Sequence, residues 1–172
     1  MTDANRENAR EQRVRQWMQD YGNTLQRICF LYLSDASLAE DAVQETFLKA
    51  WRSMDQFEGR NGSSEKTWLT RIAINTCKDY YRSNWWRIRS TARSLEDVPE
   101  KLMSMAADDR DLFTDILSLP QKYKAVILLY YYQEMPQREI AEALGISRPM
   151  VSHRLHKALK MLEMAWREED AR

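Results

Sequence analysis

Side chains that could bind a ligand are concentrated in one basic stretch near the carboxyl end of the chain. The stretch "GISRPMVSHRLHKALK", residues 145–160, holds four lysine or arginine residues, both histidines of the chain and no acidic residue. At about 100° of rotation per residue, its apolar and polar side chains fall on opposite helical faces. Such polar side chains donate hydrogen bonds to base edges and neutralise phosphates. The stretch therefore predicts a helix that binds nucleic acid.

The residues around this helix predict how it is presented. Ser147 is a natural N-cap, and Pro149 fits the first turn, where backbone N–H groups lack intrahelical partners. Upstream, "QREIAEAL" predicts a short helix that ends at Gly145, a residue that reaches positive φ easily. Together these elements predict a helix-turn-helix, whose second helix enters a major groove. The alternative is an ordinary pair of surface helices with solvated basic residues.

The remaining sequence offers little that predicts catalysis. It contains no grouping of serine, histidine and aspartate, no metal-ligand spacing and no phosphate-binding loop. We therefore expect no enzyme, no metal, no cofactor and no small-molecule substrate. Cys29 and Cys77 stand among apolar residues without a CxxC motif, which is typical of small buried side chains.

A second motif, "AEDAVQETFLKAW", places different chemistry near the amino end. Its inward helical face consists of Ala39, Ala42, Val43, Phe47, Ala50 and Trp51. Its opposite face carries Asp41, Gln44, Glu45 and Leu48. This face is either a solvated surface or a binding surface for a protein that offers arginines to the carboxylates.

A third motif, "KTWLTRIAINTCKDYYRSNWWRIR", mixes aromatic and basic side chains. Its polar members are Arg71, Asn75, Lys78, Arg82 and Arg87. Basic groups neutralise phosphates and aromatic rings stack on unpaired bases, so this motif predicts contact with single-stranded nucleic acid. Trp68 precedes an apolar pair and is expected in the core. Trp85 and Trp86 belong either to the core or to the nucleic-acid contact.

Charge is segregated along the chain although the formal net charge is zero. Residues 71–93 contain six basic residues and one acidic residue, whereas residues 94–115 contain seven acidic residues and two basic ones. The acidic connector thus lies between two basic stretches, residues 71–93 and 147–160. Such a distribution indicates that the protein binds charged partners.

Hydrophobic periodicity predicts helices over residues 14–33, 37–54 and about 67–87, and three or four more within residues 112–166. Ser37, with Glu40 three residues later, forms a capping-box pattern at the start of the second helix. The run "AVILLYYY" has strand-like composition, but no second strand is available to pair with it, so we expect a helix there.

These elements predict an all-α fold of two small helical domains joined by a flexible acidic linker. The expected boundaries are residues 1–93, 94–111 and 112–172, with the helix-turn-helix in the last part. No apolar run approaches the roughly 20 residues that span a bilayer, and the amino end lacks the apolar core of a signal peptide. We therefore expect a cytoplasmic protein.

Three blocks, taken in order, resemble the extracytoplasmic-function (ECF) group of bacterial RNA polymerase sigma factors. They are "DAVQETFLKAW", "FEGRNGSSEKTWLTRIAINTCKDYYR" and "LPQKYKAVILLYYYQEMPQREIAEALGISRPMVSHRLHKAL", and the match covers roughly residues 14–162. The resemblance implies a sigma factor that binds core RNA polymerase and directs promoter-specific transcription initiation. It implies recognition and melting of the minus-ten element, binding of the minus-thirty-five element, and an anti-sigma factor, often membrane-anchored, as a further partner.

The resemblance assigns roles to residues of each block. Those implied to bind the clamp helices of the largest polymerase subunit are Asp41, Gln44, Glu45 and Leu48. The loop residues implied to capture a flipped minus-ten base are Gly59, Arg60, Asn61, Ser63, Ser64 and Lys66. The helix residues implied to meet the same strand are Arg71, Asn75, Lys78 and Arg82. Those implied to read the minus-thirty-five element are Arg148, Ser152, His153, His156 and Lys157.

The recognition helix departs from the family pattern at its leading edge. Pro149 and Met150 stand where members usually carry Gly-Thr, and His153 stands where they carry Ser or Thr. We therefore expect a promoter preference that differs from that of relatives. The alternative function is a stand-alone helix-turn-helix regulator, which would leave the acidic face and the aromatic-basic helix unexplained.

Overall fold

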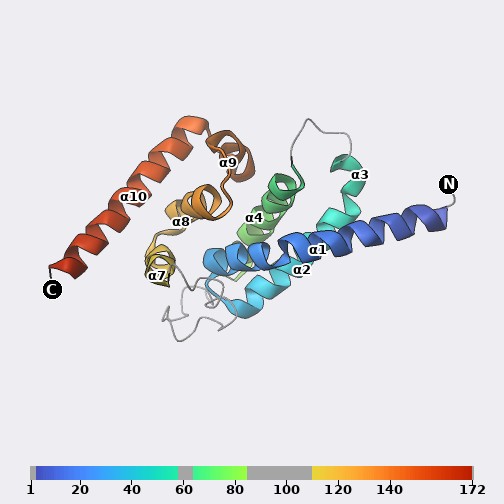
Figure 1. Cartoon of the computed structure of the whole chain (residues 1–172), viewed down its shortest axis with the longest axis horizontal. Coiled ribbons are helices and arrows are strands. Elements are labelled where there is room, and N and C mark those ends of the chain that lie inside the picture. The colour runs from blue at the N-terminus through green and yellow to red at the C-terminus, as the bar shows by residue number, and fades with distance from the viewer. Residues whose placement is uncertain (1–2, 58–63, 85–109, 172) are drawn as a thin grey trace.

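The computed structural model describes residues 3–57, 64–84 and 110–171, and the regular secondary structure of these residues is entirely helical. The amino-terminal unit comprises α1 (Asp3–Leu33), α2 (Ala36–Arg52), α3 (Met54–Phe57) and α4 (Glu65–Ser83). The carboxyl-terminal unit comprises α7 (Arg110–Ser118), α8 (Gln121–Ile127), the π-helix η2 (Leu128–Tyr132), α9 (Gln137–Leu144) and α10 (Arg148–Asp170). Figure 1 shows both units. The predicted all-α fold is confirmed. Residues 94–109 of the predicted linker, and Trp85 and Trp86, lie outside the described residues.

The core of the amino-terminal unit lies where α1, α2 and α4 pack together. The ring centroids of Trp17 and Trp68 lie 5.6 Å apart, and those of Phe57 and Trp68 lie 4.9 Å apart. Trp68 is buried, as predicted. Large aromatic side chains bury much apolar area, so this cluster fixes the amino end of α4 against α1.

Helix α1 begins at Asp3, eleven residues before the predicted start at Val14. Arg10 donates to the backbone carbonyl of Trp51 at 2.7 Å and pairs with Asp55 at 3.1 Å. Arg13 pairs with Glu65 at 2.8 Å. These contacts reach distant segments, and for this reason the local apolar periodicity gave no sign of the extension.

Helix α2 is capped by Asp35, not by Ser37 as predicted. The Asp35 carboxylate accepts a hydrogen bond from the backbone N–H of Leu38 at 2.9 Å. Asp35 has extended backbone angles, as an N-cap requires, whereas Ser37 already lies inside the helix and is exposed. The predicted capping box is therefore wrong by two residues.

Helix α4 begins at Glu65, two residues before the predicted start at Thr67. Ser64 is its N-cap, and its hydroxyl accepts from the N–H of Thr67 at 3.1 Å. The hydroxyl of Ser64 is thus committed to the helix, and Lys66, which was expected in a loop, lies in the first turn. The loop residues Gly59, Arg60, Asn61 and Ser63 lie outside the described residues.

In the carboxyl-terminal unit, "AVILLYYY" is helical, as predicted, and passes from α8 into η2. Pro120 immediately precedes α8, and its carbonyl accepts from the N–H groups of Tyr123 and Lys124. The π-helical turn is marked by the bond from the N–H of Gln133 to the carbonyl of Leu128 at 3.2 Å. Helix α7 starts at Arg110, so the last two residues of the predicted linker are helical.

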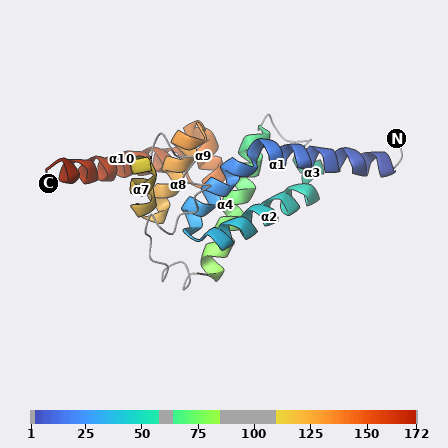
Figure 2. The same ribbon diagram turned by 60° about the horizontal axis from the view of Figure 1, so that its bottom comes forward.

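The two units touch along one seam. Helix α9 packs on α4, and α8 contacts α1, where Gln121 donates to the backbone carbonyl of Tyr32 at 2.6 Å. Figure 2 shows α1 and α10 extending away from this seam in opposite directions. Across the described residues, no helix has the length and hydropathy that crossing a membrane requires.

Candidate protein- and DNA-binding surfaces

The turn between α9 and α10 has the geometry of a helix-turn-helix. Gly145 adopts a φ of 65° at the end of α9, and the N–H of Ile146 bonds to the carbonyl of Ala141 at 3.0 Å. This pattern is the Schellman motif, which stops a helix and redirects the chain. Ser147 then caps α10, because its hydroxyl accepts from the N–H of Met150 at 3.3 Å. The predicted glycine turn and the predicted cap are confirmed.

Helix α10 presents the expected polar face. Its five predicted DNA-contacting residues, Arg148, Ser152, His153, His156 and Lys157, are all exposed. Val151, Leu155 and Ala158 are buried on the opposite side. The basic residue Arg154 is only half-buried and lines a small pocket at the seam with Lys78 and Tyr32. It therefore does not share the face of the other five.

The four residues of the predicted protein-binding face of α2 divide into two pairs. Gln44 and Leu48 line a groove toward α1. Asp41 and Glu45 lie toward Tyr80 of α4, whose pKa is raised by burial and then by these two carboxylates. The face is therefore a ridge with an apolar groove on one side and negative charge on the other.

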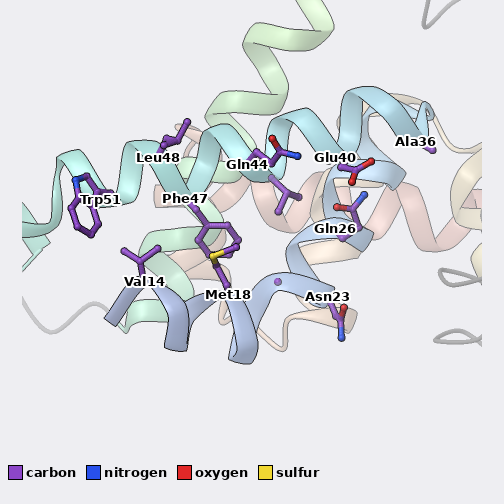
Figure 3. A pocket seen from close by; sticks show the side chains of 12 residues that line it. Val14, Met18, Asn23, Gln26, Ala36, Glu40, Gln44, Phe47, Leu48 and Trp51 are labelled. Carbon is purple, nitrogen blue, oxygen red and sulfur yellow. The ribbon is translucent and has the colours of Figure 1, made fainter. Parts of the chain in front are cut away.

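The groove lies between α1 and α2 and encloses about 650 Å³. Figure 3 shows Met18 of α1 and Phe47 of α2 pointing toward each other across it, with Val14 and Trp51 at one end. Gln26 and Glu40 lie at the other end. Met18 is 53% exposed and Leu48 is 50% exposed, so the groove presents apolar side chains from both helices to solvent.

The α1 wall of this groove was not predicted from the sequence. Val14 and Met18 are four residues apart and form a second apolar stripe beside the buried one that contains Trp17. That spacing could have indicated an exposed apolar stripe, but only the position of α2 makes it a groove. Trp51, predicted to face the core, is half-buried at the end of the groove, with the guanidinium of Arg10 at 5.5 Å from its ring.

Helix α4 carries the predicted strand-contacting residues on one stripe. At about 100° per residue, Arg71, Asn75, Lys78 and Arg82 fall within about 60° of one another. Asn75 and Arg82 are exposed, whereas Arg71 and Lys78 are half-buried where α9 approaches. Burial, followed by the nearby charge of Arg154, lowers the pKa of Lys78.

The two cysteines meet in the core between α1 and α4. Both side chains are fully buried and unoxidised. A hydrogen bond with Cys29, together with burial, raises the pKa of the Cys77 thiol well above its usual value. This agrees with the predicted role as small buried residues. In the described part of the chain, no three histidine, cysteine or acidic side chains gather where they could hold a metal ion.

Each of the two helical units matches the model of a known protein family. Residues 17–87 match the model for Sigma-70 region 2, and residues 116–162 match the model for Sigma-70, region 4. The chain is 34% identical to the ECF RNA polymerase sigma factor SigL of Mycobacterium tuberculosis, over 87% of this chain and 86% of that protein. It is 29% identical to the RNA polymerase sigma factor SigV of Bacillus subtilis, over 88% of this chain and 89% of SigV.

A solved structure shares the fold. The sigma factor RpoE of Bartonella quintana, in complex with the anti-sigma factor NepR, superimposes with a TM-score of 0.69 at 20% identity, covering 89% of this chain and 96% of RpoE. Both family models thus fall in order on the two helical units, and a curated relative aligns along most of the chain. The chain belongs to the ECF sigma factors, which direct RNA polymerase to promoters.

Proposed function

We propose that this sigma factor docks on core RNA polymerase through the ridge of α2 and the groove beside it. The supporting observation is the groove itself, in which exposed apolar side chains from two helices stand next to carboxylates. An amphipathic helix that inserts an apolar side chain between Met18 and Phe47 can place arginines beside Asp41 and Glu45. The clamp helices of the largest polymerase subunit are the partner that we assign to this surface.

We further propose that α4 binds promoter DNA. The stripe of α4, with the preceding loop, contacts the unpaired strand of the minus-ten element and helps to keep it open. Three cations and one amide on a single stripe suit this role, because they can follow a phosphate backbone and bond a base edge. The residues concerned are Arg71, Asn75, Lys78 and Arg82, with Lys66 and the loop Gly59–Ser64 upstream of them.

The recognition helix α10 reads the minus-thirty-five element in the major groove. Its five exposed residues lie on the first turns of the helix, which enter the groove first. His153 can bond a base edge directly, whereas Lys157 suits either a base or a phosphate. Because Pro149, Met150 and His153 depart from the family pattern, the preferred sequence of this element is this protein's own.

We also propose the domain boundaries, the cellular location and a regulatory partner of the chain. The domains span residues 1–93 and 112–172, and the acidic segment 94–111 lies in the nucleic-acid channels of the polymerase. The chain carries out no chemistry itself and acts in the cytoplasm, where core polymerase works. An anti-sigma factor, membrane-anchored in many members of the family, restrains it, a role supported by the complex in which the similar RpoE was solved.

The docking surface is tested by combining Gln44→Ala with Glu45→Lys. Neither side chain is buried, so folding should be retained while affinity for core polymerase falls roughly tenfold or more, as expected for central interface residues. The measurement is binding of labelled full-length protein to core polymerase, followed by promoter-dependent transcription.

A matched control carries Gln19→Ala with Glu7→Lys, two exposed positions outside the ridge that receive the same chemical changes. This control should bind core polymerase as the parent does. Equal affinity of the ridge variant and the control would remove the proposed docking surface. Absence of initiation at every promoter with the parent protein would remove the function itself.

A further inference from the structure

A small pocket lies at the seam, where helices of both units converge. It encloses about 260 Å³, and its walls come from α1, α4, α8, α9 and α10. Three of the residues that line it are cations, namely Lys78 of α4, Lys122 of α8 and Arg154 of α10. None of the described residues in its walls is acidic. The pocket therefore gathers positive charge from three helices in one place.

No carboxylate neutralises these cations in the described ranges of the chain. Lys78 donates to the backbone carbonyl of Leu144 at 3.0 Å, and the ammonium group of Lys122 lies 4.9 Å from the ring centroid of Tyr123. None of the three cations forms an ion pair with a described residue. A charge that is removed from water without a counter-charge is costly. An anion in this pocket would offset that cost.

Lys78 and Arg154 carry like charges on the walls of one pocket, and both side chains are half-buried. Burial first, and then the charge of Arg154, lowers the pKa of Lys78. An anion bound between the two would give each an opposite charge. Arg154 offers a planar fork that matches two phosphate oxygens, whereas a lysine supplies a single charged group. The chemistry of this donor set thus favours a phosphate.

The remaining walls limit what the anion can be. Tyr32 and Tyr81 meet edge to face with their ring centroids 6.4 Å apart, and Ala125 and Leu144 add apolar surface. Pockets for drug-sized ligands enclose roughly 300–1,000 Å³, so this one suits a smaller molecule. A nucleic-acid strand is too large to enter it. The pocket therefore fits a small ligand with a phosphate group and a short organic part.

We propose that this pocket binds the phosphate group of a small phosphate ester. Arg154 binds two of the phosphate oxygens, and Lys78 and Lys122 bind the others. The tyrosine rings and the apolar walls contact the organic part of the ligand. The inference goes beyond the proposed function, because neither polymerase docking nor promoter contact as proposed above uses Lys122 or Arg154.

A ligand in this pocket would touch both units at once. Lys78 belongs to the amino-terminal unit, whereas Lys122 and Arg154 belong to the carboxyl-terminal unit. A molecule that binds the folded chain, and not the unfolded one, raises its stability in proportion to the logarithm of the ligand concentration once the site is saturated. Binding and stability are therefore two independent readouts of the same site.

The first experiment measures binding to the full chain by isothermal titration calorimetry. The probes are inorganic phosphate, pyrophosphate and glycerol 3-phosphate, in a chloride buffer of constant ionic strength, because salt screens charge interactions. We expect one molecule of each probe to bind per chain. Glycerol 3-phosphate should bind at least as tightly as inorganic phosphate, because its glycerol part meets the apolar walls.

The pocket variant combines Lys122→Gln with Arg154→Gln. It should bind each probe about tenfold more weakly or worse, because two charged donors are lost. The matched control is Arg52→Gln with Lys160→Gln, which makes the same change of charge at exposed positions outside the pocket. The control should bind as the parent does. Arg154→Lys keeps the charge but loses the planar fork, so its affinity should lie between those of the parent and the pocket variant.

The second experiment measures unfolding by urea, first without phosphate. Arg154→Gln should then leave the midpoint no lower than Lys160→Gln does, because it removes the repulsion between Arg154 and Lys78. A cation with a purely structural role would instead lower the midpoint when it is removed. Saturating pyrophosphate should raise the midpoint of the parent and leave that of the pocket variant almost unchanged.

A fluorescent single-stranded oligonucleotide distinguishes a small ligand from a nucleic-acid phosphate. If the pocket variant loses affinity for the oligonucleotide but keeps the parent's affinity for glycerol 3-phosphate, the cations serve nucleic acid and the proposed site is wrong. Absence of saturable binding of all three probes to the parent overturns the site as well. So does an equal loss in the pocket variant and the control, or several anions per chain, since both mean unspecific attraction to positive charge.

Discussion

Asp35 sets where α2 begins, and α2 is the helix that carries the proposed docking ridge. Its carboxylate bonds the N–H of Leu38, and Leu38 and Ala39 are buried immediately after it. If Ser37 were the cap, the N–H groups of Leu38 and Ala39 would lose their hydrogen bonds to Asp35. Unpaired N–H groups are costly in a first turn that is buried. The Asp35 carboxylate therefore fixes the beginning of the helix that carries Asp41, Gln44 and Glu45.

Asp35→Ala should lower the free energy of unfolding by about 1 kcal/mol, because it removes an N-cap hydrogen bond. Ser37→Ala, at the position where sequence alone placed the cap, should change it by less than about 0.5 kcal/mol, since its side chain is exposed. Urea unfolding followed by circular dichroism compares the two. A larger loss at Ser37 would contradict the observed cap.

Among the elements, the helix-turn-helix depends on one short helix that stops sharply at a glycine. Helix α9 has only eight residues and ends in the Schellman turn at Gly145, so that α10 leaves at the angle that exposes its polar face. The same shortness brings the Leu144 carbonyl to the end of α9, where Lys78 reaches it. The turn at Gly145 therefore positions both α10 and the carbonyl group that Lys78 bonds.

Gly145→Ala should destabilise the protein by about 1 kcal/mol. A Cβ at this position would have open space around it, so the cost comes from the φ of 65° alone. Gly22 is the matched control, because it lies inside α1 and a Cβ there would also meet nothing. Gly22→Ala should stabilise by about 0.5–1 kcal/mol. Midpoints of chemical unfolding give both values, and equal signs would contradict the assigned turn.

For the molecule taken whole, the two surfaces that we assign to promoter DNA differ in how far other helices cover them. The stripe of α4 that we assign to the minus-ten element lies at the seam, where Lys78 and Arg71 bond to α9. The five residues of α10 that we assign to the minus-thirty-five element are all exposed.

Duplex DNA that carries the minus-thirty-five element should therefore bind the parent and the Glu139→Lys, Glu142→Lys variant with affinities within about twofold, once each is corrected by the charge-matched control Glu163→Lys, Glu168→Lys. Fluorescence anisotropy at a fixed salt concentration is the measurement, because phosphate contacts make every such affinity depend on salt. A large gain for this duplex would mean that Glu139 and Glu142, which bond to α4, also weaken DNA binding by α10.

Local patterns in the sequence predict the helices, the helix-turn-helix and the polar residues of the candidate surfaces. These features depend on residues within a turn or two of each other, as with Ser147 and Met150, or Gly145 and Ala141. Periodicity also separated the buried Val151, Leu155 and Ala158 from the exposed His153 and His156, because a helix maps sequence spacing directly onto faces.

What those surfaces contact depends on how distant segments of the chain pack together. The groove needs Met18 and Phe47 from two helices, and Arg71 meets Glu142 across 71 positions of the chain. The roles of Arg10 and Lys66 were missed for the same reason, since their partners Trp51 and Gln133 lie far away in the sequence. Helix formation is a local matter, whereas the choice of which exposed faces come together depends on the burial of the whole chain.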